Sequence, residues 1–168
     1  MAVAEPDDLR NINLQTFAGS ALFSKTFEEG MALVEETARY LDGRGRQESR
    51  DLSRKVATLY AGESMRVTTR LMQAASWLLV QRAVHEGDMD AGDAAGDRYR
   101  LGSKEICLAG RTDGVDLLPT KLQELLEQSD NLYRRIARLD DVLFGAGDKP
   151  QGVQAHFSAL EQAFGTDV

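Results

Sequence analysis

Residues 52–86 read LSRKVATLYAGESMRVTTRLMQAASWLLVQRAVHE, and no proline interrupts them. When successive residues are placed 100° apart, most of the apolar side chains fall on one side of a helix. This apolar stripe comprises Leu52, Val56, Leu59, Tyr60, Val67, Leu71, Ala74, Trp77 and Leu78. The stretch therefore predicts one helix of about 50 Å, at a rise of about 1.5 Å per residue, against which the other elements pack.

The opposite side of this helix carries small, neutral or sulfur-containing side chains instead of charges. Met65, Met72 and Leu79 recur there at intervals of seven residues and form an apolar line. Two neighbouring helices cover only part of a helix's circumference, so this line stays exposed unless something else covers it. We expect a second copy of the chain or a partner protein to cover it. The alternative is a fourth helix of the same chain.

Three polar residues, Glu63, Arg70 and Gln81, fall inside the apolar stripe. Because a buried charge without a partner is strongly destabilising, we expect these side chains to be paired across helices. Antiparallel packing would place Glu63 opposite Gly30, and a later helix would bring Arg134 or Arg135 to a similar height. We interpret the three residues as a polar core that sets the register of the bundle; a functional polar pocket is the alternative.

Two further helices are predicted on either side of this one. Apolar residues at spacings of three and four predict a helix over about 20–41, which begins after Ser20 and ends at Asp42-Gly43. The segment DGRGRQES is short and glycine-rich, so we interpret it as a connection between antiparallel helices. A leucine-rich pattern after Pro119 predicts another helix over about 118–144. The expected fold is all-α, an antiparallel three-helix bundle over residues 17–144.

The remaining segments are polar or rich in glycine. Residues 1–16 show no periodicity and are expected to form a mobile lead-in. Residues 87–116 are rich in Gly and Asp, which indicates a long, solvated loop that is mobile or functional, apart from a frayed helix over 91–101. Residues 145–168 are expected to form a flexible tail with a short amphipathic helix, which docks on the bundle or contacts a partner through Phe157, Leu160 and Phe164.

Composition excludes several classes of protein. A net charge of −7 and a pI near 4.9 argue against a protein that coats nucleic acid, since binding to phosphates needs a surplus of Lys and Arg. No segment is apolar enough to span a membrane, and residues 1–13 do not resemble a signal peptide. The single cysteine, Cys107, excludes an internal disulfide. We expect a cytoplasmic protein.

The sequence offers no set of catalytic or metal-binding residues. Neither His85 nor His156 follows a Glu at the three-residue spacing of di-iron bundles. The Gly-Arg-Gly-Arg segment at 43–46 follows a helix and lacks the ending of a phosphate-binding loop, and the Asp residues of 88–97 lack calcium-loop spacing. We therefore expect neither an enzyme nor a protein with a cofactor.

Several strings of the sequence resemble the RcdA family, the regulators of CtrA degradation of alphaproteobacteria. The longest run is ESMRVTTRLMQ at 63–73, which continues as ASWLL at 75–79 and QRA at 81–83. Further matches are EGMALVEE at 29–36, YLDG at 40–43 and RLD at 138–140. The resemblance covers roughly residues 17–144, and neither the loop over 87–116 nor the tail contributes to it.

The resemblance implies a three-helix bundle that forms a homodimer and acts without catalysis as a proteolytic adaptor in the cell cycle. Such a protein would tether cargo, for example a CtrA-like response regulator, to a ClpXP protease primed by a CpdR-like response regulator. The ClpX-type unfoldase would then be a partner, with no direct contact to nucleic acid or membrane, and recruitment to a cell pole stays open. The alternative is a helical scaffold or cofactor that binds another transcriptional regulator, unrelated to proteolysis.

Overall fold

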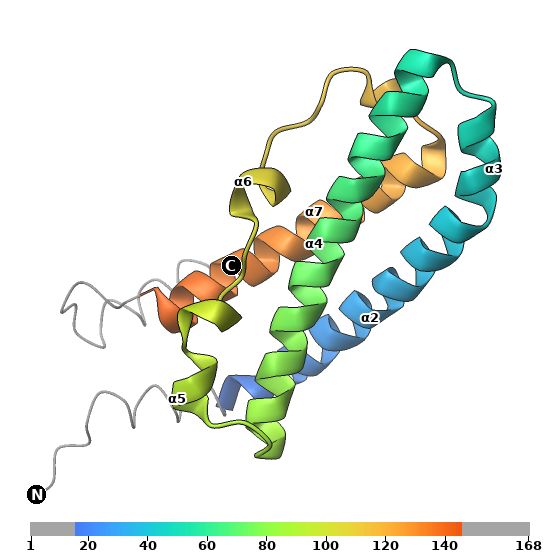
Figure 1. Cartoon of the computed structure of the whole chain (residues 1–168). Coiled ribbons are helices and arrows are strands. Elements are labelled where there is room, and N and C mark those ends of the chain that lie inside the picture. Colours follow the sequence, from blue (N-terminus) through green and yellow to red (C-terminus); the bar gives the residue numbers. More distant parts are fainter. Residues whose placement is uncertain (1–15, 146–168) are drawn as a thin grey trace, which may run out of the picture.

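The structure, a computed structural model, describes residues 16–145 of the chain (Figure 1). Over this range the fold is all-α, and no strand is present. Three long helices, α2 (Ala21–Asp42), α4 (Arg54–Glu86) and α7 (Thr120–Phe144), pack together as a bundle. The predicted lead-in up to residue 15 lies outside the described residues, as do the tail residues Phe157, Leu160 and Phe164.

The helices begin and end where local chemistry favours it. The hydroxyl of Ser20 accepts a hydrogen bond from the Phe23 amide at 3.2 Å, which caps α2. The helix predicted from about residue 52 begins two residues later, because the Ser53 side chain caps α4 by accepting from the Val56 amide. At the other end of α4, Gly87 adopts a left-handed conformation with φ of 81° that ends the helix.

The segment predicted to connect two antiparallel helices does connect α2 and α4, and it contains a short helix of its own, α3 (Arg44–Arg50). Gly45 serves close packing here, since a Cβ atom at this position would lie 2.6 Å from Tyr60 Oη. Tyr40 Oη donates a hydrogen bond to Glu48 at 2.9 Å and ties α2 to α3. From the sequence alone, a glycine required for close packing cannot be distinguished from a glycine required for a turn.

The direction of the helices follows from their cross-contacts. Gly30 of α2 lies against Leu78 of α4, and Tyr40 lies near Tyr60, so these helices are antiparallel. Helix α7 also runs antiparallel to α2, but it runs parallel to α4, because residues 87–119 return along the length of the bundle before α7 begins (Figure 1). We call this returning segment the strap.

The strap contains α5 (Ala91–Ala94), η1 (Asp97–Tyr99), α6 (Lys104–Cys107) and η2 (Val115–Leu117). Four of its apolar residues, Leu101, Cys107, Val115 and Leu118, are at most 5% exposed and belong to the main core. The expectation of a mobile, solvated loop is therefore wrong for this segment. Isolated apolar residues between the glycines and aspartates anchor it, and they are too widely spaced to show a helical period.

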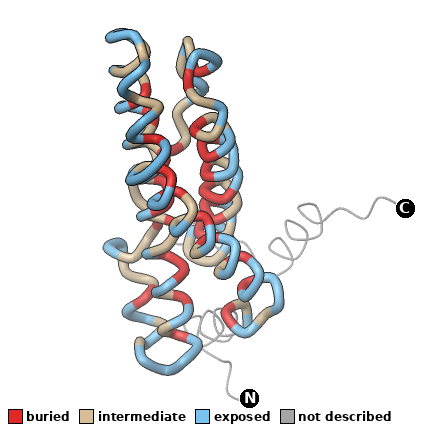
Figure 2. Tube along the Cα trace, turned by 90° about the vertical axis from the view of Figure 1, so that its right-hand side faces the viewer, coloured by how far each residue is buried: buried red, intermediate tan, exposed pale blue. Residues whose placement is uncertain are grey.

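The core lies between the three long helices and under the strap. Its largest fully buried side chains are Trp77, Tyr133, Leu78, Leu122, Leu125, Leu132 and Ile136. Figure 2 shows buried residues on the facing sides of the helices and exposed residues on their outer sides. Helix α4 packs against both α2 and α7 and so holds the central position that its length predicted.

Candidate functional site

The apolar line on α4 is exposed. Met65, Met72 and Leu79 have 71%, 66% and 52% of their surface accessible, the largest values among the long apolar side chains of α4. The bundle partners and the strap cover the other sides of α4, and no other helix within residues 16–145 lies over this line. Within the described part of the chain, the alternative of a covering fourth helix is therefore wrong.

The three polar residues of the predicted polar core, Glu63, Arg70 and Gln81, are all buried, at 4%, 4% and 0% exposure. Each meets a different environment. Arg70 is fully hydrogen-bonded across the bundle, Glu63 is bound by the strap, and Gln81 has no partner. The three side chains thus lie where the stripe placed them, but they do not form one connected network.

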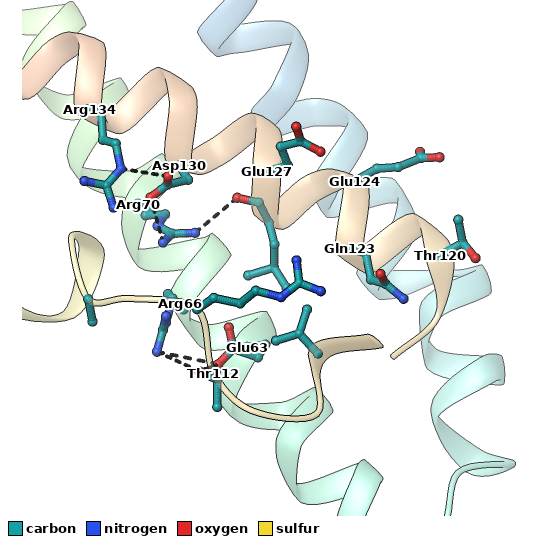
Figure 3. Close-up of a pocket in the computed structure, with 14 residues that line it drawn as sticks. Glu63, Arg66, Arg70, Thr112, Thr120, Gln123, Glu124, Glu127, Asp130 and Arg134 are labelled. Carbon is teal, nitrogen blue, oxygen red and sulfur yellow. Dashed lines mark hydrogen bonds and ion pairs between the residues drawn. The ribbon is translucent and has the colours of Figure 1, made fainter. Parts of the chain in front are cut away.

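Arg70 joins three elements of the fold. Its Nε donates to the Cys107 carbonyl at 2.9 Å, and its Nη1 donates to the Leu126 carbonyl at 3.2 Å. Its Nη2 pairs with Asp130 Oδ1 at 3.0 Å, and the same carboxylate accepts from Arg134 Nε at 2.7 Å (Figure 3). Burial lowers the pKa of Arg70, and the charge of Asp130 opposes this change. The guanidinium therefore connects α4 to α7 and to the strap.

Glu63 is held by the strap. Its Oε1 accepts a hydrogen bond from Thr112 Oγ1 at 2.7 Å, and Arg66 lies 3.6 Å away on the same helix. Arg66 in turn donates to the Gly110 carbonyl at 3.0 Å. It also donates to Thr112, a contact marked in Figure 3. The carboxylate thus has a neutral donor and a cation near it, both at the edge of the core.

The partners predicted for Glu63 are wrong. Gly30 faces Leu78, and Arg135 pairs with Glu29 at 2.7 Å, while Arg134 binds Asp130. The reason is geometric: Glu63 faces the strap side of α4, away from α2. The sequence placed no packed element there.

Gln81 is completely buried, and neither its amide nitrogen nor its carbonyl oxygen has a hydrogen-bond partner in the structure as described. The prediction that this residue is paired across helices is therefore wrong. An unsatisfied buried amide destabilises a fold by roughly 1–3 kcal/mol. The Gln81 side chain forms no hydrogen bond to another group of the protein within residues 16–145.

A second buried polar centre, at Asp140 of α7, was missed by sequence reasoning. The Asp140 carboxylate is fully buried and accepts from Trp77 Nε1 at 2.9 Å, from Arg100 Nε at 3.0 Å and from the Leu101 amide at 3.4 Å. Its position four residues after Ile136, on the apolar face of α7, is a signal that could have revealed it. Asp140 thus holds the first half of the strap through hydrogen bonds to Arg100 and Leu101. Arg70 and Glu63 hold the second half through Cys107 and Thr112.

A polar pocket of about 550 Å³ lies between α4, α7 and the second half of the strap (Figure 3). Positive and negative side chains line it in equal number: Arg66, Arg70, Arg111 and Arg134 with Glu63, Glu124, Glu127 and Asp130. Nothing in this balance favours an anion or a cation. Within residues 16–145, no three His, Cys, Asp or Glu side chains are arranged to hold a metal ion.

The fold and this geometry define a class: an all-α bundle in which most buried charges are paired internally and one apolar helix face is open to solvent. The model of a family described as "Protein of unknown function (DUF1465)" matches residues 14–164. The crystal structure of RcdA from Caulobacter crescentus CB15 is 52% identical, covers 77% of this chain and 97% of that chain, and superposes with a TM-score of 0.64. The chain belongs to the RcdA family, which confirms the resemblance of its motifs.

No curated protein matches this chain. Of the helices in the described range, none is long and apolar enough to cross a membrane.

Proposed function

We propose that this chain is a non-catalytic adaptor that tethers cargo proteins to a primed ClpXP protease for cell-cycle-regulated proteolysis. The observation that carries the proposal is the 52% identity to RcdA, which extends over 97% of that chain. RcdA proteins are regulators of CtrA degradation, so a CtrA-like response regulator is the expected cargo. A CpdR-like response regulator and a ClpX-type unfoldase are the expected partners on the protease side.

The open face of α4 supports a role in protein contacts. Met65, Met72 and Leu79 form a continuous apolar line on a rigid helix, and such a line is the usual anchor for a second helix. We propose that it is the face on which the chain forms a homodimer or meets a partner. Modest contacts suffice for an adaptor, since tethering raises the local concentration of cargo at the protease. Recruitment to a cell pole would follow from these contacts.

Reconstituted degradation tests the proposal. Purified ClpX, ClpP, a CpdR-like regulator and a CtrA-like cargo are incubated with and without the chain, and loss of cargo is followed over time. We expect the chain to accelerate degradation only when the primed protease is present. If no candidate cargo is degraded faster, and the chain retains no contact with the protease or its priming factor, the adaptor function is wrong and a scaffold role is favoured.

The apolar line is tested in the same assay. Met72→Glu places a charge at the centre of the line, whereas Leu22→Glu places the same charge on an apolar residue of α2 that is 41% exposed and lies outside it. We expect Met72→Glu to reduce delivery and Leu22→Glu to leave it unchanged. Equal activity of both variants would remove the line from the proposed contacts.

A further inference from the structure

A groove of about 760 Å³ runs beside the apolar line, between the first half of α4 and the second half of the strap. Its apolar lining comes from Val56, Leu59 and Met65 of α4 and from Ile106 and Leu117 of the strap. Ile106 and Leu117 are 55% and 63% exposed, whereas Leu101, Cys107, Val115 and Leu118 of the same strap are buried. Both side chains therefore face solvent at the rim of the groove.

The floor of the groove contains Gly62, a glycine in the interior of a long helix. A Cβ atom at this position would meet nothing within 4 Å, so packing inside the chain does not require a glycine here. A glycine at such a position destabilises a helix by about 1 kcal/mol relative to alanine. The missing side chain leaves the backbone of α4 open to close approach by another chain.

A surplus of cations lies next to one end of the groove, whose own charged lining is balanced, with Lys55 and Arg66 against Glu63 and Asp113. Residues 39–55, which form the tip of the bundle around α3, carry six Lys or Arg and only three Asp or Glu in a chain of net charge −7. Arg39 and Arg44 pair with nearby glutamates. Four further cations at the tip are exposed and have no ion-pair partner within residues 16–145: Arg46, Arg50, Arg54 and Lys55.

We propose that this groove binds a short segment of a partner protein that carries apolar anchors followed by acidic residues. The apolar anchors would lie over Gly62, between Leu59 and Leu117, and the carboxylates would lie over Lys55 and the basic tip. A second copy of the chain is the other occupant that the variants below distinguish from a partner segment. The site deepens the proposed adaptor function and rests on it.

Direct binding to the full-length chain tests the site. The probe is a fluorescein-labelled peptide that repeats the sequence Leu-Glu-Glu-Leu, and its anisotropy is measured against increasing chain concentration. Its counterpart, which repeats Leu-Lys-Lys-Leu, reports whether the charge is recognised. We expect saturable binding of the glutamate peptide that weakens with added salt. The proposal would be overturned if the glutamate peptide showed no saturable binding. It would also be overturned if the lysine peptide bound as well and the groove variants weakened the binding of both peptides to the same degree.

Matched variants locate the binding. Both Gly62→Leu and Gly62→Ala raise the helix propensity of α4, so we expect similar increases in the thermal midpoint. Only the leucine side chain fills the floor of the groove, so the two variants should differ in peptide binding. We expect at least an about tenfold loss of affinity for Gly62→Leu and for Leu117→Glu, since an apolar anchor loses its contact. Gly62→Ala and Leu22→Glu, an exposed change on α2 outside the groove lining, should bind within about twofold of the parent chain. Equal binding by all four variants would place the peptide elsewhere.

The charged end is tested by Lys55→Glu against Arg138→Glu, an exposed residue of α7 whose change alters the net charge equally. We expect an about two- to fivefold loss for Lys55→Glu alone, the range of one solvent-exposed charge pair. If both variants weaken binding to the same degree, the acidic part of the proposal is wrong.

Other occupants give different results in the same set of variants. If Leu160→Asp in the full chain tightens peptide binding about tenfold, the groove is occupied by the chain's own residues 153–164. If Gly62→Leu converts a dimer to a monomer in sedimentation while Met72→Glu does not, a second copy is the occupant. Either result would overturn the proposal that a segment of a partner protein occupies the groove. Failure of reconstituted degradation with intact peptide binding would count against the adaptor function alone.

Discussion

The two sides of α4 reverse the usual distribution of side chains. On the side under the strap and α7, the helix buries Glu63 and Arg70, and on its open side it exposes Met65 and Met72. The buried charges persist because hydrogen-bond donors and acceptors from two other elements surround them. The exposed apolar side chains have no such partner within residues 16–145. The covered side of α4 thus stabilises the fold, and its open side is available for binding.

The largest effect is expected at Arg70. Arg70→Ala leaves the Cys107 and Leu126 carbonyls without this donor and leaves the Asp130 carboxylate with Arg134 alone, which should lower the free energy of unfolding by about 2–4 kcal/mol. Thermal unfolding followed by circular dichroism measures this change. Arg39→Ala, which breaks an exposed pair with Glu35, is the control and should change stability little. An unchanged midpoint for Arg70→Ala would show that the paired guanidinium does not hold the covered side together.

A smaller loss is expected at the strap. Thr112→Val keeps the shape of the side chain but removes the donor that binds Glu63, so the buried carboxylate loses a hydrogen bond. We expect a loss of about 1–3 kcal/mol, with increased hydrogen exchange in the second half of the strap. Thr58→Val, at an exposed position of α4, is the matched control. Equal midpoints for the two variants would mean that Arg66 alone stabilises Glu63.

An increase in stability is expected at Gln81. Gln81→Met replaces an unsatisfied amide by an apolar side chain of similar length, and we expect a gain of about 1–2 kcal/mol in the free energy of unfolding. Gln128→Met, at an exposed position of α7, should change it little. A lower midpoint for Gln81→Met, measured in urea, would mean that the amide is satisfied in solution, for example by a water molecule.

The smallest effect on stability is expected on the open side. Met72→Glu should leave the thermal midpoint of the folded chain nearly unchanged, because the side chain is 66% exposed. Its effect should appear in self-association: sedimentation velocity of the parent chain should show a dimer and that of the variant a monomer. An unaltered dimer would move the interface away from this line, and a large loss of stability would show that the open side is part of the fold.

Sequence reasoning succeeded where a regular period carries the information. The spacing of apolar residues located α2, α4 and α7, and the same stripe placed Glu63, Arg70 and Gln81 in the interior. The exposed line on α4 followed from geometry, since neighbours cannot surround a helix in a bundle of three. These results depend only on which side of a helix each residue occupies.

Partners that arrive from irregular segments could not be predicted. Cys107 and Thr112, which bind Arg70 and Glu63, belong to a strap whose anchors follow no period. The same strap supplies Arg100 to Asp140, so the second polar centre was equally invisible. Gln81 was expected to be paired because most buried amides are, and this structure is an exception.

The parallel course of α4 and α7 also determines the order in which the chain can fold. Tyr40 and Glu48 meet across only eight residues, whereas Arg70 and Asp130 are sixty residues apart and Trp77 and Asp140 are sixty-three apart. Nearby segments pair quickly, and distant ones wait for a long closure. During synthesis we therefore expect α2 and α3 to pair first and the contacts of α7 to form after those of the preceding helices. Until α7 packs, Arg70 and Trp77 lack the partners that α7 supplies, so the polar contacts of α4 are completed by a helix made about sixty residues later.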